Sequence, residues 1–189
     1  MKQGDQVLHN GRAAIVLIEP FRHDDDVRLR YVDTDEYKFI PRSEIKERPT
    51  FPTIYMNLAV GLSERSTCLR GTRVGCVITT VDFRRVLAVG YNGNAAGLSN
   101  HCDVIGEAAV GNCGCIHAEE NAVISCTEHR STEKIVFSTH LPCSACAKRI
   151  IQLGGVVKVL YLNDYRKKEG LGMLSMVGID HKQMLKEGT

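Results

Sequence analysis

Two short segments of the chain carry side chains that bind metals and move protons. Glu119 follows His117 by two residues, and Cys143 and Cys146 form a Cys-x-x-Cys pair that a proline precedes. One imidazole and two thiolates suit zinc, and three protein ligands leave a tetrahedral ion one open position, as in catalytic zinc sites. Zinc lowers the pKa of a water held there from about 15.7 to roughly 7. We interpret Glu119 as a proton shuttle beside that water and not as a ligand.

A Cys-x-x-Cys pair has other uses, and the residues alone leave them open. Cys143 and Cys146 could instead belong to a structural zinc site or to a redox pair. A zinc-stabilised binding scaffold without catalysis is therefore an alternative from another class of protein. Glu119 discriminates between the two, because a purely structural site has no use for an acid beside an open coordination position. We favour the catalytic site.

The composition is that of an ordinary globular protein. The chain has 189 residues, 43% of them hydrophobic, which is enough for one domain and a small appendage. A net charge of +2 and the absence of tryptophan argue against a nucleic-acid partner. Without a long apolar run or a leader, we expect no membrane partner and a cytoplasmic location, the host cytoplasm for a viral protein. The eight cysteines are interpreted as thiols and metal ligands.

Residues 1–48 predict a small all-β module. Alternating stretches are punctuated by turn signals such as Asn10-Gly11, a pattern typical of an antiparallel barrel or sheet; the stretches are 13–18, 27–32 and 37–40. We expect a barrel of the SH3 or Tudor type, serving as a packing or assembly appendage or as a ligand-binding module. Two prolines predict a linker at 47–52.

Residues 53–189 predict an α/β domain. Strands and helices alternate after a long irregular loop at 92–115, and this order implies a three-layer α/β/α sandwich. Both metal-binding segments then begin helices, so the ligands converge at two neighbouring helix N-termini, where the positive helix ends favour thiolates. The expected helices are 53–66, 117–126, 143–153 and 167–176, and the expected strands are 74–79, 86–91, 134–139, 156–162 and a short one from 178.

In content and order, these motifs resemble the cytidine deaminase superfamily and, within it, the deoxycytidylate (dCMP) deaminases, over roughly residues 53–180. Zinc deaminases share the signature H-x-E followed by P-C-x-x-C. The segments that carry the resemblance are 64–68, 74–78, 90–93, 115–122 and 141–148. The resemblance implies a five-stranded mixed sheet between helices and a homo-oligomer, often a hexamer.

The resemblance also implies roles for individual residues. His117, Cys143 and Cys146 would bind the catalytic zinc, and Glu119 would accept and donate protons. The implied substrate-binding residues are Asn92, which would contact the sugar and the pyrimidine, Ala118, and two candidates for the 5′-phosphate, Arg65 and Arg166. Asn92 is alternatively a turn residue before Gly93, and each arginine is alternatively a surface charge.

Two further sites follow from the resemblance. The segment Gly90-Tyr91-Asn92-Gly93 resembles the region where many dCMP deaminases bind dCTP as activator and dTTP as inhibitor. Ala96 stands where a proline is common in the family, which leaves the substrate contacts less fixed than the metal ligands. Some related enzymes carry a structural zinc near the long loop, and the candidate ligands here are Cys68, His101, Cys102 and Cys113, with Cys115 nearby. Buried cysteines that pack as small apolar groups are the alternative.

The activity that we expect is zinc-dependent hydrolysis of dCMP to dUMP and ammonia. The nearest rival is deamination of a base within RNA or DNA, which calls for a basic groove or stacking aromatic residues. Another cytosine nucleotide such as dCTP is a further alternative substrate.

Overall fold

The computed structural model describes residues 3–17, 26–68, 72–99, 114–165 and 168–185. The chain divides into two compact units, residues 1–50 and 51–189. None of the described helices has the length and apolar character needed to cross a membrane. No disulfide joins the six cysteines in the described ranges.

The first unit is an antiparallel sheet with strand order β4-β3-β2-β1-β5. Asn10 and Gly11 connect the first two strands with φ values of 48° and 77°, and the flanking residues His9 and Arg12 pair across the turn. Two residues with positive φ form the tight turn whose twist matches that of a hairpin. The elements are β1 (Gln6–His9), β2 (Arg12–Leu17), β3 (Asp26–Tyr31), β4 (Tyr37–Pro41), the 3-10 turn η1 (Arg42–Glu44) and β5 (Lys46–Glu47).

The all-β prediction for this unit is confirmed, with two differences in detail. Strands β1 and β5 were not expected, since they are short, with four and two residues. The boundary between the two units falls inside the linker expected at 47–52, but the linker is shorter, because Glu47 belongs to β5 and helix α1 begins at Phe51. Pro52 fits the first turn of that helix, where the missing N–H has no intrahelical partner to lose.

The second unit contains a five-stranded mixed sheet with strand order β10-β9-β8-β6-β7. Strand β6 runs antiparallel to both of its neighbours, while β8, β9 and β10 run parallel to one another. The strands are β6 (Gly75–Thr80), β7 (Val86–Tyr91), β8 (Lys134–His140), β9 (Val156–Asn163) and β10 (Asp180–Gln183), and the helices are α1 (Phe51–Ser63), α2 (Ala118–Ser125), α3 (Ser144–Leu153) and α4 (Glu169–Met176).

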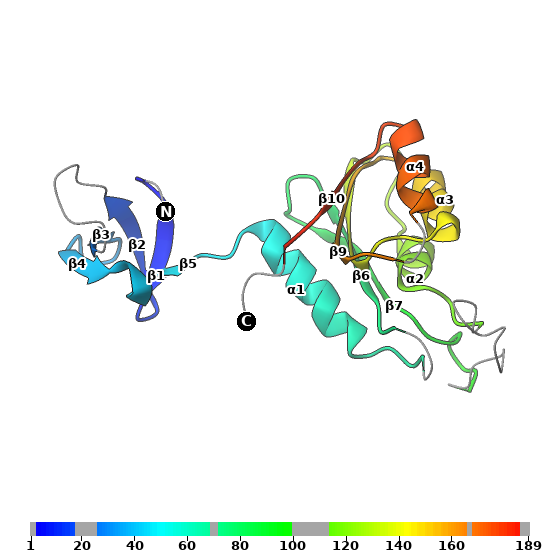
Figure 1. The fold of residues 1–189 in the computed structure, drawn as a ribbon, viewed down its shortest axis with the longest axis horizontal. Coiled ribbons are helices and arrows are strands. Elements are labelled where there is room, and N and C mark those ends of the chain that lie inside the picture. The colour runs from blue at the N-terminus through cyan, green and yellow to red at the C-terminus, as the bar shows by residue number, and fades with distance from the viewer. Residues whose placement is uncertain (1–2, 18–25, 69–71, 100–113, 166–167, 186–189) are drawn as a thin grey trace. The chain divides into compact units, whose positions relative to one another are not determined.

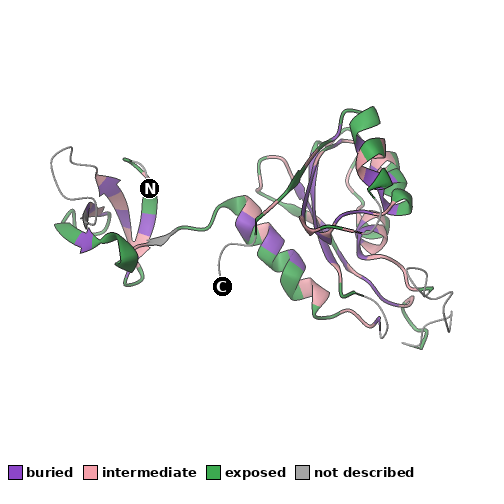
Figure 2. Cartoon of the chain, in the orientation of Figure 1, coloured by how far each residue is buried: buried purple, intermediate pink, exposed green. Residues whose placement is uncertain are grey.

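Helices cover both faces of this sheet, as the sequence predicted (Figure 1). Successive residues of a strand point to opposite faces, so β6 and β8 each contribute to two hydrophobic clusters. Val77 and Phe137 belong to the cluster on the α1 side, whereas Ile78 and Val136 belong to the cluster with α2, α3 and α4. Both strands are buried over nearly their whole length (Figure 2), so the sheet forms the centre of the domain.

A close approach between backbones fixes α2 against the sheet. A Cβ atom at Gly90 of β7 would lie 2.2 Å from the carbonyl oxygen of Ala118 and 2.6 Å from the backbone nitrogen of Ala122. Asn121 adds a hydrogen bond from its side-chain Nδ2 to the carbonyl oxygen of Tyr91, at 2.8 Å. The start of α2 therefore has a fixed position over β7.

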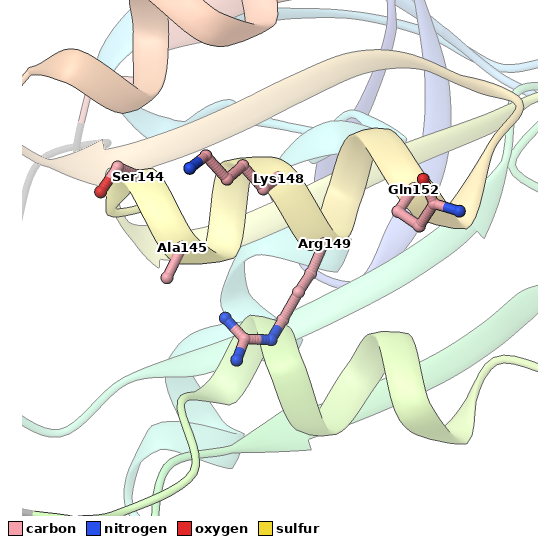
Figure 3. A pocket seen from close by; sticks show the side chains of 5 residues that line it. All are labelled: Ser144, Ala145, Lys148, Arg149 and Gln152. Atoms are coloured by element: carbon pink, nitrogen blue, oxygen red, sulfur yellow. The ribbon is translucent and has the colours of Figure 1, made fainter.

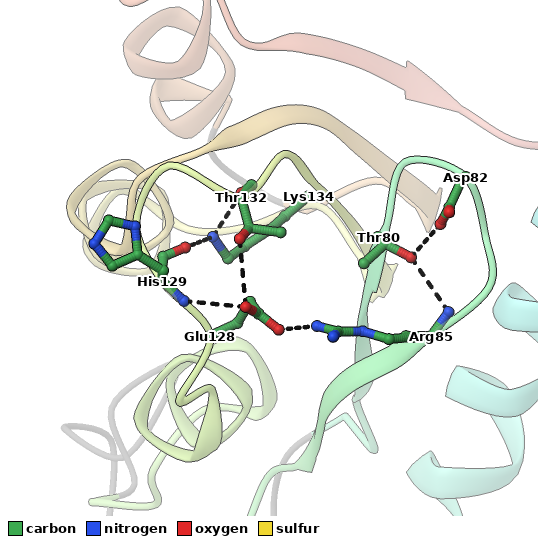
Figure 4. Close-up of polar contacts among 7 residues, drawn as sticks. All are labelled: Thr80, Asp82, Arg85, Glu128, His129, Thr132 and Lys134. Atoms are coloured by element: carbon green, nitrogen blue, oxygen red, sulfur yellow. Dashed lines mark hydrogen bonds and ion pairs between the residues drawn. The ribbon is translucent and has the colours of Figure 1, made fainter.

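A buried lysine holds the loop between α2 and β8 (Figure 4). The Lys134 side chain is inaccessible to solvent, and its Nζ donates to the carbonyl oxygens of His129 and Thr132, both at 2.7 Å, and of Gly154 at 3.2 Å. Three acceptors match the three hydrogens of the ammonium group. The lysine thereby connects this loop to the turn that follows α3.

We expect Lys134→Met to lower the free energy of unfolding by about 3 kcal/mol, because buried carbonyl groups that lose their partner cost about 1–3 kcal/mol each. Chemical denaturation measures the change. Lys168→Met is the matched control, since Lys168 is exposed and its ion pair with Asp164 lies on the surface, where such pairs contribute little. Equal effects of the two substitutions would contradict the role given to Lys134.

Candidate active site

Two helix starts bring the expected metal ligands together. His117 is the N-cap residue of α2 and Cys143 the N-cap residue of α3, while Cys146 lies in the first turn of α3. The segment before α2 is fixed by a β-bridge between Gly93 and Ile116. The expectation that the three ligands lie at two helix N-termini agrees with this arrangement.

The three ligand atoms lie at distances that suit one metal ion. The Nδ1 atom of His117 is 3.6 Å from the Sγ atom of Cys143 and 3.3 Å from that of Cys146, and all three atoms lie within 4.8 Å of one another. A tetrahedral zinc ion with Zn–S of about 2.3 Å and Zn–N of about 2.0–2.1 Å requires N···S separations of about 3.6 Å. Among the described residues this is the one such group of three or more ligands. The donor set and its spacing therefore fit zinc.

The two thiols differ strongly in acidity. Hydrogen bonds from the Cys146 thiol and from His117, with the Cys146 backbone N–H at 3.5 Å, lower the pKa of Cys143 to about 3. The same thiol–thiol hydrogen bond, together with burial and the charge of Glu119, raises the pKa of Cys146. The pair thus shares one proton, which a metal would displace because only thiolates bind it.

Glu119 lies beside this group and is almost completely buried, with 4% of its surface exposed. Burial raises the pKa of its carboxyl group. The hydroxyl of Ser138 on β8 donates a hydrogen bond to Oε1 of Glu119 at 3.2 Å. A raised pKa makes this carboxyl group a better proton acceptor than an exposed glutamate.

Other residues predicted for the site have mainly structural contacts here. Asn92 is buried, its Oδ1 accepts from the backbone nitrogen of Val74 at 2.7 Å, and its Nδ2 donates to the carbonyl oxygen of Thr72 at 3.0 Å. The side chain of Ala118 packs in the core. Arg65 is exposed in the turn after α1.

The segment 90–93, expected to bind effectors, also has structural contacts. Gly90 lies against α2, and a Cβ atom at Gly93 would lie 2.2 Å from Oγ1 of Thr67. Of the candidate ligands for a second metal, Cys68 is buried. Arg166, His101, Cys102 and Cys113 lie outside the described residues.

Sequence reasoning missed three contacts around the site. Ser138 faces Glu119, and its signal in the sequence is a hydroxyl in an otherwise apolar part of a strand. Arg149 of α3 forms an ion pair with Glu120 of α2 at 3.0 Å, so it connects the two helices that carry the ligands. Gly170 of α4 contacts the backbone of Pro142 and Cys143.

A shallow surface pocket lies on the outer side of α3 and is separate from the ligand group. Figure 3 shows its lining side chains, which are Ser144, Ala145, Lys148, Arg149 and Gln152. Cys146 of the same helix is buried, with 1% of its surface exposed, and therefore faces the opposite side. The candidate ligand group therefore lies on the inner side of α3.

Comparison with known proteins decides the family. The model of the cytidine and deoxycytidylate deaminase zinc-binding region matches residues 50–163. The chain belongs to this family. The matched region contains His117, Glu119, Cys143 and Cys146, and both the zinc-binding family and the geometry of the His117, Cys143 and Cys146 group fit zinc.

Individual relatives agree with the family match. The deaminase domain resembles the crystal structure of dCMP deaminase from the cyanophage S-TIM5 in complex with dCMP and dUMP, with a TM-score of 0.63, 33% identity, and coverage of 72% of this chain and 98% of that one. The chain is 32% identical to deoxycytidylate deaminase of Saccharomyces cerevisiae and 31% identical to that of Schizosaccharomyces pombe, over 82% and 73% of its own length. It spans about half the length of these two curated relatives, 50% and 45%.

We expect Gly170→Ala to weaken zinc binding. A Cβ atom at this position would lie 2.2 Å from the carbonyl oxygen of Pro142 and 3.3 Å from the carbonyl carbon of Cys143, so the ligand-bearing turn must shift. Supporting contacts around metal ligands typically contribute about 10–100-fold in affinity, and competition with a chromophoric chelator measures the loss.

Gly172→Ala is the matched control, because it lies on the same helix and a Cβ atom there would meet nothing within 4 Å. It should leave zinc affinity unchanged. If Gly170→Ala retained the affinity of the wild type, α4 would not support the position of Cys143.

Proposed function

We propose that this protein deaminates dCMP hydrolytically, giving dUMP and ammonia. The observation that carries the proposal is the group of His117, Cys143 and Cys146 with the buried carboxyl group of Glu119 beside it. The relatives support the choice of dCMP, since the yeast proteins are deoxycytidylate deaminases and the cyanophage enzyme was crystallised with dCMP and dUMP. The chain spans only about half the length of the yeast enzymes, so we propose the activity for this chain and do not transfer it from them.

His117, Cys143 and Cys146 would hold one zinc ion. When bound, zinc activates water as a nucleophile at neutral pH. Glu119 moves the protons: it takes up the two protons of the attacking water in turn, delivers the first to N3 of the cytosine ring and delivers the second to the amino nitrogen on C4, which leaves as ammonia. Its raised pKa, which burial causes, favours holding a proton between these two transfers. Water thereby replaces the amino group, and uracil results.

We expect Glu119→Gln to retain zinc but to release ammonia from dCMP at least 100-fold more slowly, because positioned proton transfer contributes about 10²- to 10⁴-fold. A coupled ammonia assay and metal analysis of the same samples provide the two measurements. Glu133→Gln is the control, since this residue is exposed before β8. Wild-type turnover in the Glu119 variant would refute the mechanism.

Assays with dCMP, dCTP, cytidine and a short single-stranded nucleic acid test the choice of substrate. Faster turnover of the nucleic acid would favour deamination of a base within RNA or DNA. The net charge of +2 and the absence of tryptophan argue against that rival. Full zinc with no turnover on any of the four would favour the zinc-stabilised scaffold instead.

A second, structural zinc would be bound by Cys68 with His101 or Cys102 and Cys113. Two observations support this site: Cys68 is buried, and the other three residues are of types that bind zinc and lie in the long loop at 92–115. Two zinc ions per chain in the wild type and one in Cys68→Ser would support the site, whereas one in both would remove it.

Arg65 and Arg166 are our candidates for binding the 5′-phosphate, and residues 90–93 for binding dCTP or dTTP as effectors.

We also propose a cytoplasmic homo-oligomer, with a hexamer favoured. Helix α1 supports association, because it has no charged residue and exposes several large apolar side chains, which are Phe51, Ile54, Leu58 and Val60. Light scattering of the full chain measures the mass. The N-terminal unit would be an SH3- or Tudor-type packing or binding module.

A further inference from the structure

Ser138 is a polar residue at a core position of the central sheet. It lies two residues after Val136 in β8, so both side chains are on the face that α2 and α3 cover. The side chain of Ser138 is completely buried. A hydroxyl group moved from water into an apolar environment costs free energy unless it forms a hydrogen bond. The position therefore favours an apolar residue unless a partner compensates.

The partner is the carboxyl group of Glu119. Ser138 Oγ lies 3.2 Å from Glu119 Oε1, and an ionised carboxylate only accepts, so the hydroxyl donates. This contact joins the floor of the site, β8, to α2.

The surroundings of Glu119 make this donor important. Burial raises the pKa of Cys76, and the negative charge of Glu119 raises it further. The hydrogen bond with Cys143 and burial raise the pKa of Cys146, to which the charge of Glu119 and a hydrogen bond with it also contribute, so the carboxylate lies near both thiols. Cys76 is the partner of Ser138 in the register between β6 and β8 and is also fully buried. Thiols are weak donors, and Ser138 therefore offers the carboxylate the stronger side-chain hydrogen bond on the sheet side.

We propose that Ser138 is a positioning residue that fixes the orientation of the Glu119 carboxylate through its Oε1 atom. Its effect on turnover rests on the proposed deamination of dCMP. Its effect on the carboxylate does not, because the hydrogen bond exists without substrate. The two can therefore be measured separately.

The test compares Ser138→Ala and Ser138→Cys, which remove the strong donor, with Ser138→Thr, which keeps a hydroxyl. We expect the first two to retain zinc, to lower kcat for dCMP about 10- to 100-fold and to change KM less than about twofold. Ser138→Thr should recover most of kcat. Two donor-deficient variants keep the test decisive if one of them folds poorly.

Thr79→Val is the matched control. It deletes a hydroxyl from the adjacent strand β6, and this hydroxyl is fully buried without a hydrogen-bond partner in the described part of the chain. It should leave kcat unchanged. A loss of kcat in Thr79→Val as large as that in Ser138→Ala would show a general effect of altering the sheet and would overturn the proposal.

Infrared difference spectra against Glu119→Gln, with glutamate labelled by ¹³C, report the carboxyl stretch of Glu119 directly. We expect Ser138→Ala and Ser138→Cys to shift this band and Thr79→Val to leave it in place. An unshifted band or an unchanged kcat in both donor-deficient variants would overturn the proposal. A shifted band in a protein whose wild type does not deaminate dCMP would uphold the hydrogen bond and reject the proposed function.

Discussion

The site depends on the convergence of two helix N-termini on one side of a mixed sheet. His117 and Cys143 are both N-cap residues, so the backbone that fixes where each helix starts also fixes where each ligand lies. The positive ends of helices favour anionic groups such as thiolates. This arrangement concentrates the ligands before any metal is bound.

Close backbone contacts maintain that convergence. Gly90 lets β7 lie directly under the first turn of α2, and Gly170 lets α4 lie directly on the turn before α3. A side chain at either position would meet a carbonyl oxygen at 2.2 Å, and backbone cannot move aside as a flexible side chain can. The ion pair of Arg149 with Glu120 then connects the two helices on their outer side.

Residue type and spacing were sufficient to predict that His117, Cys143 and Cys146 lie together and that the domain has three layers. Few other functions explain a pattern made of His117, Glu119, Cys143 and Cys146. The long segments with regular hydrophobic spacing predicted the helices and strands. The start of α1 was missed because Pro52 indicates a break in most contexts but is tolerated in a first turn. The contacts of Ser138 and Gly170 could not be predicted, because they depend on which atoms lie opposite these residues in space; for Ser138 the sequence shows only a hydroxyl in an apolar strand.

The three candidate ligands also come from distant parts of the chain. His117 is separated from Cys143 by 26 residues and from Cys146 by 29, and the segment between them includes all of β8. An ion bound by all three would act as a cross-link that closes this loop only in the folded state. Folding and metal binding are then linked equilibria, and each tenfold rise in free zinc above the dissociation constant adds about 1.4 kcal/mol to the stability of the domain. The resistance of this domain to unfolding in a cell would accordingly follow the supply of available zinc.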